Sequence, residues 1–535
     1  MKKSSLIYLT FLSIILAVYY LVLGIDMHNN GYYNHESLFY MEKARIVFEG
    51  LGNRLKVIGL TSPILPFYGM MPFTAFNNYA FAPLIASALG TALLFLIMGI
   101  CVQKTTKDPF FMFVLLALFV FHPGILFVAC SGKSIYIILI FFFLFFYNIF
   151  RFYHSNTTFH ISMSSILLVA LLFCDYKFIW MTLFFVPLVI SIAIQSLNLA
   201  EKQSIFRLFI SFNNPSLRRK LVNKTFAIYI IIFILPIIAV MCYRILNQTH
   251  ANDFNYFLDN PYSTWNVLIT KLESSITPAI DNYRLPEVSF LTTIRIIIYC
   301  PLIVLAAFLL RNNIQHFITI LIPLALVEFL KIEFPDVFLA QQYYLIFIII
   351  SFMALLFKST VVSQNNIYKF LISACIVVEI FSGYVYLNNS FIESEQSFIT
   401  IATQPRLRQA DDGFTSTRYD EYIDVAQYIN SMPRNSKVLV DDANAYPIAA
   451  YVKNIHKLTL PYQDIFLSAI ENPAPYVNYV LVATGTNTVG GYTQLNEKYK
   501  AIMEVKNNIM MDKTYETDNW IIYKIRERDA SFAAN

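Results

Sequence analysis

Several acidic and basic side chains stand beside long apolar segments, where they could serve proton transfer or anion binding. Asp26 ends the first apolar segment, and the pair His35-Glu36 follows shortly after it. A carboxylate can act as a general base towards a hydroxyl or an amine. Lys133 and Lys177 stand in short turns between later apolar segments, and lysine acts as a point charge for phosphate. These residues are the first candidates for a site.

Each candidate also has a purely structural interpretation. Glu36 is placed to stabilise the N-terminus of a following helix, where a carboxylate is favourable. Lys133 and Lys177 could simply extend from helix ends towards water, and Asp175 could pair with Lys177. The sequence leaves both interpretations open.

The composition excludes several classes of protein. Of 535 residues, 57% are hydrophobic and 14% are charged, whereas a soluble protein carries about 25% charged residues. The mean hydropathy is +0.56. A soluble enzyme, a disordered chain and a nucleic-acid-binding module are therefore excluded. Residues 1–387 hold 25 Lys/Arg and 16 Asp/Glu, while residues 388–535 hold 14 and 18, so we predict a membrane part followed by a more soluble part.

Apolar segments of membrane-spanning length recur through the first part. A bilayer core requires about 20 apolar residues per helix. The segments lie at residues 5–24, 80–102, 110–128, 134–150, 159–174, 178–196, 226–247, 293–310, 314–331, 341–357 and 367–387. We predict a mainly α, polytopic transmembrane bundle of about eleven spans over residues 1–387. A linker over 388–417 and a small α/β domain over 418–535 follow.

Basic residues predict the orientation of the bundle. If the N-terminus is cytoplasmic, the loops on that side are rich in Lys and Arg and hold only two acidic residues, Asp108 and Glu201, as the positive-inside rule requires. The C-terminal domain then lies outside, which in a bacterium means the periplasm, with the bundle in the inner membrane. Two outside loops, 25–79 and 248–292, are also long enough to hold a site.

The first outside loop contains a helical pattern over residues 36–49. Leu38, Met41 and Phe48 fall near one stripe of such a helix, which predicts a short amphipathic helix on the membrane surface. Gly50 is a natural helix stop.

This loop and several later stretches resemble the GT-C superfamily of polytopic glycosyltransferases, in particular its protein O-mannosyltransferase and aminoarabinose transferase group. The matching stretches are His35-Glu36, Ala44 to Gly50, Ser62-Pro63 through Pro66, Phe121 to Ser134, Cys174 to Phe178, and Gln341 to Leu345. Two positions depart from the family pattern. His35 stands where the acidic pair has its Asp, and Gln342 stands where the family often has Arg before Tyr.

The resemblance implies an enzyme that transfers a sugar from a polyprenyl-phosphate donor to an extracytoplasmic lipid, polysaccharide or protein. Such an enzyme needs a carboxylate base, for which Glu36 is the first choice and Asp26 the second. It also needs a cation beside the leaving phosphate. The predicted substrate-binding residues are Lys177, Lys133, His35, Gln342, Tyr343 and Arg244, with Arg295 and Lys331 as alternatives to Arg244.

Membrane lipid is a further expected partner, and nucleic acid is not. Some members of the superfamily use a divalent cation, for which Asp26, Glu36 and His35 are the candidate ligands. The sequence has no recognisable metal motif.

The C-terminal part alternates strand and helix patterns, which predicts a partly parallel sheet. The strands are expected at residues 437–441, 457–460, 479–483 and 520–524. Asp441 and Asp442 follow the first of them, at the kind of edge where open α/β sheets bind ligands, unless Asp442 only caps the next helix. We expect the domain to cover the membrane cavity or to recruit an acceptor.

Two other functions stay open. A transporter or flippase of lipid-linked saccharide would place charges deep in many spans and contain inverted repeats. A non-catalytic envelope protein would not need Glu36. Because no repeat is evident and the acidic residues gather outside the spans, the glycosyltransferase is the leading interpretation.

Overall fold

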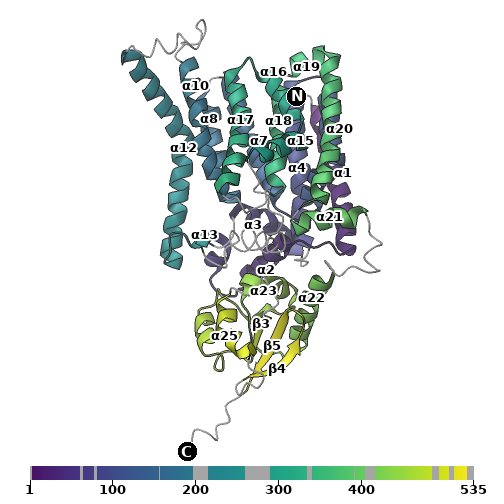
Figure 1. Ribbon diagram of the computed structural model, residues 1–535, viewed down its shortest axis with the longest axis vertical. Helices are drawn as coiled ribbons and strands as arrows, with labels where there is room; N and C mark the ends of the chain where they lie inside the picture. The colour runs from purple at the N-terminus through teal and green to yellow at the C-terminus, as the bar shows by residue number, and fades with distance from the viewer. Residues whose placement is uncertain are drawn as a thin grey trace, which may run out of the picture.

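A helical bundle stands on a small α/β domain, and the first loop of the chain lies between the two (Figure 1). The computed structural model describes residues 3–60, 64–76, 81–155, 157–196, 215–259, 289–333, 340–390, 392–403, 416–484, 493–504 and 511–526. We call the end of the bundle that faces the α/β domain the domain end.

Six helices in the described ranges are long and apolar enough to cross a membrane, or up to nine spans if each of three bent pairs counts as one. The six are α1 (Lys3–Asn29), α4 (Ala82–Thr105), α7 (Ile135–Ser155), α12 (Pro215–Ala251), α17 (Ile314–Glu333) and α20 (Asn366–Asn388). The bent pairs join α5 (Pro109–Phe121) to α6 (Pro123–Cys130), η4 (Tyr176–Trp180) and α9 (Met181–Phe184) to α10 (Val186–Ser196), and α15 (Ser289–Tyr299) to α16 (Leu302–Leu310).

Two shorter apolar helices fill the remaining predicted segments. They are α8 (Thr158–Cys174), of 17 residues, and α18 (Gln342–Phe357), of 16 residues. At 1.5 Å per residue they reach about 25 Å, close to the thickness of a bilayer core. Every predicted apolar segment is therefore a helix or a bent pair, and the chain is a multi-pass membrane protein.

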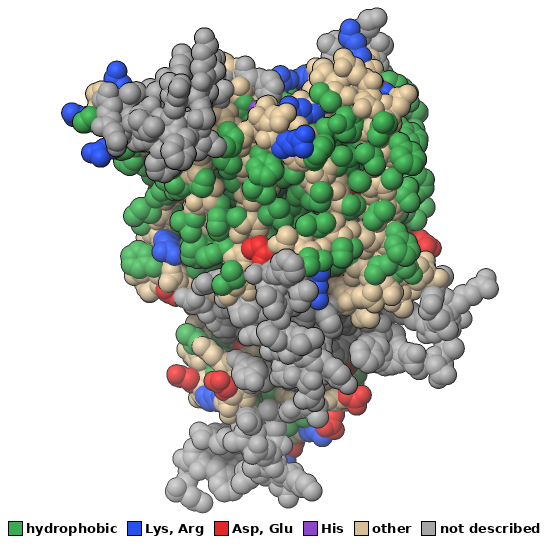
Figure 2. Space-filling model, turned by 45° about the horizontal axis from the view of Figure 1, so that its top comes forward, with side chains coloured by type: hydrophobic (Ala, Val, Ile, Leu, Met, Phe, Trp, Pro, Cys, Tyr) green, Lys and Arg blue, Asp and Glu red, His purple; other side chains and the backbone are tan. Residues whose placement is uncertain are grey.

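The outer surface of the bundle is apolar (Figure 2). Only 28% of the apolar window of α1, of α12 and of α20 is buried inside the protein, and large side chains such as Phe226 and Phe381 are more than 60% exposed. Such a surface suits lipid contact. Several Lys and Arg side chains gather at the end of the bundle remote from the α/β domain (Figure 2). This sidedness supports the predicted orientation.

The helix predicted over residues 36–49 is α2 (His35–Glu49). The Asn34 side chain accepts a hydrogen bond from the Glu36 N–H at 2.8 Å, and Gly50, with φ of +79°, ends the helix. All residues from Leu38 to Val47 are buried, because the α/β domain covers the helix from the other side. The expectation of a helix exposed on the membrane surface is therefore wrong. Three short helices follow, η1 (Lys56–Leu60), α3 (Ile64–Met70) and η2 (Met71–Phe76).

The C-terminal part contains a five-stranded sheet in the order β2-β1-β3-β5-β4. Strands β1 (Val438–Leu439), β2 (Leu458–Thr459) and β3 (Tyr479–Ala483) run parallel, and β5 (Trp520–Ile525) pairs antiparallel with both β3 and β4 (Met511–Glu516). The partly parallel sheet is confirmed. The sequence did not predict β4, whose residues are mostly exposed and carry no apolar run.

Several helices belong to the same domain as this sheet. They are α22 (Ser416–Ser431), α23 (Asp442–Tyr451), η8 (Ile455–Lys457), α24 (Phe466–Glu471) and α25 (Gln494–Glu504). Within the predicted linker, residues 393–403 form the helix α21 (Glu393–Thr403), while residues 391 and 404–415 lie outside the described ranges. Two further short helices are α13 (Tyr256–Asp259) and α19 (Ser359–Gln364). Of the predicted loop 248–292, residues 260–288 are likewise not described.

Candidate functional site

Glu36 lies in the first turn of α2 and contacts the start of α7. Its Oε1 accepts hydrogen bonds from the Ser134 hydroxyl at 2.5 Å and from the Ser134 N–H at 3.2 Å. Ser134 directly precedes α7, so the carboxylate satisfies a backbone N–H that the helix itself leaves unpaired. Glu36 stands in the first turn of α2, as its structural interpretation expects, and it also contacts a residue 98 positions away. Glu36 stays half-buried and keeps a second oxygen.

The turn Ser131-Gly132-Lys133-Ser134 packs closely against the same end of α2. Gly132 has a φ of +74°, and a Cβ there would lie 2.4 Å from the Ser37 Oγ, so only glycine fits without strain. The Ser37 hydroxyl donates to the Ser131 carbonyl at 3.2 Å. The turn therefore fixes where Lys133 stands.

Lys133 faces α21 rather than Glu36. Its Nζ lies 5.5 Å from the centre of the Phe127 ring. Burial raises the pKa of Glu395 on α21, and the positive charge of Lys133 partly offsets that rise. Glu395 also accepts hydrogen bonds from the Gln341 N–H and the Ser390 hydroxyl, both at 2.8 Å. Sequence reasoning missed this buried carboxylate.

A second group of polar residues surrounds Asp175, which is buried at the domain end of α8. The Asp175 Oδ2 accepts hydrogen bonds from the Tyr343 hydroxyl at 2.6 Å and from the Gln342 side chain at 3.0 Å. Its Oδ1 accepts from the Lys177 N–H at 3.0 Å. The Lys177 Nζ lies 5.8 Å from the centre of the Tyr343 ring.

Arg244 joins this group through Tyr176, to whose hydroxyl its Nη2 donates at 3.4 Å. We call Asp175, Tyr176, Lys177, Arg244, Gln342 and Tyr343 the Asp175 cluster. The structure thus brings together four of the six predicted substrate-binding residues, from three separate parts of the sequence. Asp175, predicted only as a partner of Lys177, is the centre of the cluster.

Tyr40 is a buried side chain of α2 that feels the charge of Glu36. Burial raises the pKa of the Tyr40 hydroxyl, and the nearby Glu36 carboxylate and Cys174 raise it further, while Ser134 lowers it. Cys174 directly precedes Asp175.

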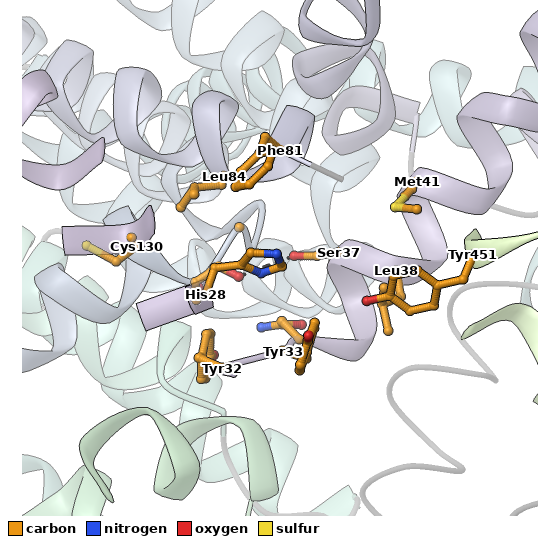
Figure 3. A pocket seen from close by; sticks show the side chains of 14 residues that line it. His28, Tyr32, Tyr33, Ser37, Leu38, Met41, Phe81, Leu84, Cys130 and Tyr451 are labelled. Atoms are coloured by element: carbon orange, nitrogen blue, oxygen red, sulfur yellow. Dashed lines mark hydrogen bonds between the residues drawn. The ribbon is translucent and has the colours of Figure 1, made fainter. Parts of the chain in front are cut away.

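A small open pocket lies beside the first turn of α2 (Figure 3). Polar side chains that line it include Asn34 and Ser37, which flank Glu36 in the sequence. His28 stands in the middle of the view (Figure 3), with its ring centre 5.2 Å from that of Tyr33 and 5.1 Å from that of Phe81. Tyr451 reaches the pocket from α23. The pocket combines aromatic walls with a few polar groups, as small-molecule sites do.

The other predicted residues lie apart from these groups. Asp26 is exposed at the domain end of α1 and is not among the residues that line the pocket. His35 turns towards the α/β domain, with its Nδ1 3.1 Å from the Tyr446 hydroxyl. Arg295 is exposed on α15, and Lys331 is buried on α17.

The candidate metal ligands do not converge. Asp26 is exposed, Glu36 contacts Ser134 and His35 contacts Tyr446. In the described part of the chain, no three His, Cys, Asp or Glu side chains lie close enough together to hold a metal ion. These three residues therefore do not fit a cation site, and we derive no step from one.

Charged side chains that sequence reasoning missed lie buried between α2 and α23. The Lys43 ammonium pairs with the Asp442 Oδ2, and with the Glu42 Oε2 at 2.9 Å. Burial raises the pKa of Glu42 to about 8 against the opposing charge of Lys43, and Asp442 raises it further. Asp441, and not Asp442, caps α23, because its Oδ1 accepts from the Ala443 N–H at 3.1 Å. The predicted cap at Asp442 is therefore wrong.

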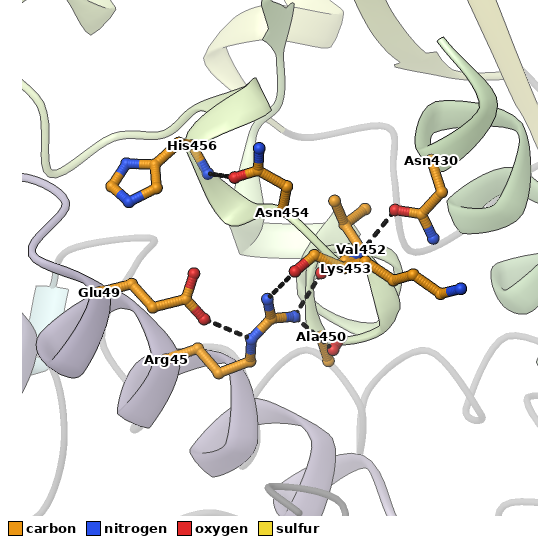
Figure 4. Close-up of polar contacts among 8 residues, drawn as sticks. All are labelled: Arg45, Glu49, Asn430, Ala450, Val452, Lys453, Asn454 and His456. Atoms are coloured by element: carbon orange, nitrogen blue, oxygen red, sulfur yellow. Dashed lines mark hydrogen bonds and ion pairs between the residues drawn. The ribbon is translucent and has the colours of Figure 1, made fainter. Parts of the chain in front are cut away.

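Arg45 holds the other end of α23 (Figure 4). Its guanidinium donates to the carbonyl groups of Ala450 and Lys453, each at 3.0 Å, and to that of Val452. Its Nε donates to Glu49 at 3.1 Å. The Ala450 and Val452 carbonyls are among those that the C-terminus of α23 leaves unpaired, and a cation there is favourable.

Comparison with known proteins supports the fold. No protein-family model matches the chain, and a search of the curated proteins finds no match. Among solved structures, the chain is similar to ArnT from Cupriavidus metallidurans bound to undecaprenyl phosphate, at 10% sequence identity and a TM-score of 0.50. The match covers 96% of this chain and 97% of that one. It confirms the predicted fold, a polytopic helical bundle with a C-terminal α/β domain.

Proposed function

We propose that this protein is a membrane glycosyltransferase that transfers a sugar from a polyprenyl-phosphate donor to an acceptor at the domain end of the bundle. The observation that carries the proposal is the Asp175 cluster. Gln342 and Tyr343 contact Asp175 and Lys177 from a distant part of the sequence, and Arg244 reaches the hydroxyl of the intervening Tyr176. The similar solved structure holds undecaprenyl phosphate, a lipid of the same chemical class as the proposed donor.

Lys177 and Arg244 are the proposed partners of the donor phosphate. Breaking the bond between the sugar and the phosphate leaves negative charge on the phosphate oxygen, and fixed cations stabilise that charge. Asp175 orients their surroundings, since it binds the Lys177 backbone, Gln342 and Tyr343 at once. Lys133, Gln342 and Tyr343 remain proposed contacts of the substrate. His35 also remains a proposed contact, although its ring faces Tyr446 of α23.

Glu36 is the proposed general base. Both hydrogen bonds from Ser134 go to Oε1, so Oε2 is the oxygen that would take the proton from the acceptor hydroxyl or amine. The acceptor then attacks the anomeric carbon, and the electron pair of the breaking bond stays on the phosphate. Asp26 is the alternative base; it is exposed, and like Glu36 it is not among the residues that line the pocket.

The pocket of Figure 3 is the proposed entrance for the acceptor, because it borders the turn of α2 that carries Glu36. We further propose that the bundle lies in the inner membrane of a bacterium with the N-terminus in the cytoplasm, which makes the domain end periplasmic. The gathering of Lys and Arg side chains at the opposite end supports this orientation.

The test compares envelope glycans of cells that carry the wild-type chain, Glu36→Gln, Asp26→Asn or the double variant. We expect Glu36→Gln to lose the glycan that the wild type adds, and Asp26→Asn to keep it. Loss of the glycan only in Asp26→Asn would transfer the role of base to Asp26. If the double variant keeps the wild-type glycans, the proposal that the protein is a glycosyltransferase is overturned.

A further inference from the structure

The α/β domain holds α2 through both ends of one helix, α23. Lys43 of α2 pairs with Asp442 in the first turn of α23, and Arg45 of α2 binds the carbonyl groups at its last turn. The two cations are two residues apart, and both are buried. A helix that is fixed at both ends can neither slide along its partner nor rotate against it.

Two further contacts tighten the same interface. The Tyr446 ring of α23 packs edge-on against Phe39 of α2, with ring centres 5.6 Å apart. Just beyond α2, the Asn53 N–H donates to the Tyr462 carbonyl at 3.0 Å. A Cβ on Gly52 would lie 2.2 Å from that carbonyl oxygen, so the loop and the domain touch backbone to backbone.

This interface uses the edge of the sheet that usually serves a ligand. Open α/β sheets bind ligands outside the carboxyl ends of their parallel strands. Here that edge carries Asp441 and Asp442 after β1, and Lys43 of the chain's own loop helix fills the place. The edge therefore recognises α2 and is not open to a soluble ligand at Asp442.

The buried charges indicate that the contact serves position rather than stability. A buried ion pair adds little stability relative to a well-packed apolar pair, because desolvation offsets the attraction. Its directional contacts do select one register between two elements. The Lys43 ammonium also lies 4.6 Å from the ring centres of both Phe39 and Tyr462, so its place is fixed from several sides.

We propose that Lys43 and Asp442 are positioning residues through which the α/β domain sets α2, and with it Glu36, against the donor. This inference rests on the proposed function, because it assigns the domain a task in that same reaction. Glu36 lies two turns before Lys43 on one helix, so a shift of α2 moves the carboxylate relative to Ser134 and the Asp175 cluster.

The first variant is Asp442→Asn in the full-length chain. The Asp442 charge is one of the causes that raise the pKa of Glu42, so in its absence Glu42 ionises more readily and becomes the acidic partner of Lys43, at 2.9 Å on the same helix. The buried ammonium then stays compensated while the link between α2 and α23 is lost. The exposed pair of Asp512 and Arg526 in the same domain provides the matched control, Asp512→Asn.

Two measurements are made on each variant in lipid nanodiscs. Amide hydrogen exchange reports the protection of residues 38–49, with α4 as internal reference. Steady-state transfer from a polyprenyl-phosphate sugar reports kcat and the KM for the donor. We expect Asp442→Asn to raise exchange in α2 and to lower kcat at least tenfold, with the KM changed less than twofold. Asp512→Asn should match the wild type in both.

A rescue separates positioning from charge. The double variant Lys43→Met/Asp442→Leu replaces the pair by apolar side chains that can still pack across the interface, and we expect it to regain most of the kcat and the protection lost in Asp442→Asn. If Asp442→Asn does not fold, Arg45→Lys carries the same test, since lysine keeps the charge but loses the planar fork that reaches three carbonyl groups.

Two results would overturn the inference. Unchanged exchange in a folded Asp442→Asn would show that the pair does not hold α2. Raised exchange with unchanged kcat would show that the docking has no effect on Glu36. A wild-type chain that transfers no sugar while Asp442→Asn still loosens α2 would instead count against the proposed function, so the two failures are distinguishable.

Discussion

The Ser134 Oγ lies 2.5 Å from the Glu36 Oε1, so the first turn of α2 is bonded to the residue that precedes α7. This contact explains how a half-buried carboxylate can be fixed in direction without an ion pair. One oxygen is held, and the other is left to face a substrate.

Glu36→Gln distinguishes the structural role of one carboxylate oxygen from the proposed catalytic role of the other. The amide oxygen of the new glutamine can still accept from Ser134, so the fold and the donor affinity should stay unchanged, while the loss of the base should lower kcat by about 10²- to 10⁴-fold. Transfer kinetics and binding of undecaprenyl phosphate measure the two effects. As the control, Ser134→Ala should cost less in kcat, because it frees the carboxylate without removing it.

Asp175→Asn tests the centre of the Asp175 cluster. Asp175 accepts three hydrogen bonds, whereas asparagine has an amide group at one of these positions and leaves a donor of Gln342 or Tyr343 unpaired. A buried group left unpaired costs about 1–3 kcal/mol, which corresponds to roughly 5- to 150-fold in donor affinity if the cluster binds the phosphate. Titration with undecaprenyl phosphate measures it. Tyr343→Phe, which removes one bond only, should lie between the wild type and Asp175→Asn, and equal affinity in all three would contradict the assignment.

The helices of the bundle could be predicted from the sequence because a membrane restricts the conformation of each segment that crosses it. In lipid, every backbone group must bond within its own segment, so a long apolar run such as residues 367–387 has few alternatives to a helix. Lys177 could be found by the same reasoning, since it stands in a short turn between apolar segments, whereas Gln342 and Tyr343 were indicated by the family resemblance. The short strand β4 escaped prediction, because no apolar run marks its residues 511–516.

The contacts that build the site could not be predicted, because they join distant residues. Lys43 and Asp442 are 399 positions apart, and neither has a local pattern that points to the other. Glu42 and Lys43 lie on a face of α2 that the sequence pattern of the helix does not mark as buried. Only the packing of the α/β domain shows that this face is buried.

Gly132→Ala should disturb the turn that carries Lys133. Alanine at a φ of +74° is strained, and its Cβ would overlap the Ser37 Oγ, so we expect a loss of about 1–3 kcal/mol in stability. Thermal unfolding of the purified protein measures the loss. Gly50→Asn is the matched control, because Gly50 also has a positive φ but only the flexible Arg54 side chain nearby, and asparagine tolerates that conformation. Equal unfolding temperatures for Gly132→Ala and the wild type would contradict the packing of the turn.

Glu42 should make the stability of the protein depend on pH. Burial raises its pKa from 4.5 to about 8, with Lys43 on its own helix and Asp442 on α23 as the charged groups that face it. The folded protein therefore binds a proton that the unfolded chain releases above its ordinary pKa. The resulting stabilisation is complete below pH 4.5 and is lost as the pH rises through about 8, with a slope of at most about 1.4 kcal/mol per pH unit.

Glu42→Gln imitates the protonated side chain at every pH, so its unfolding temperature should fall less than that of the wild type between about pH 5 and pH 8. Glu516→Gln, at an exposed pair with Lys513, should retain the wild-type dependence, and parallel curves for Glu42→Gln and the wild type would show that Glu42 is ionised in the folded protein.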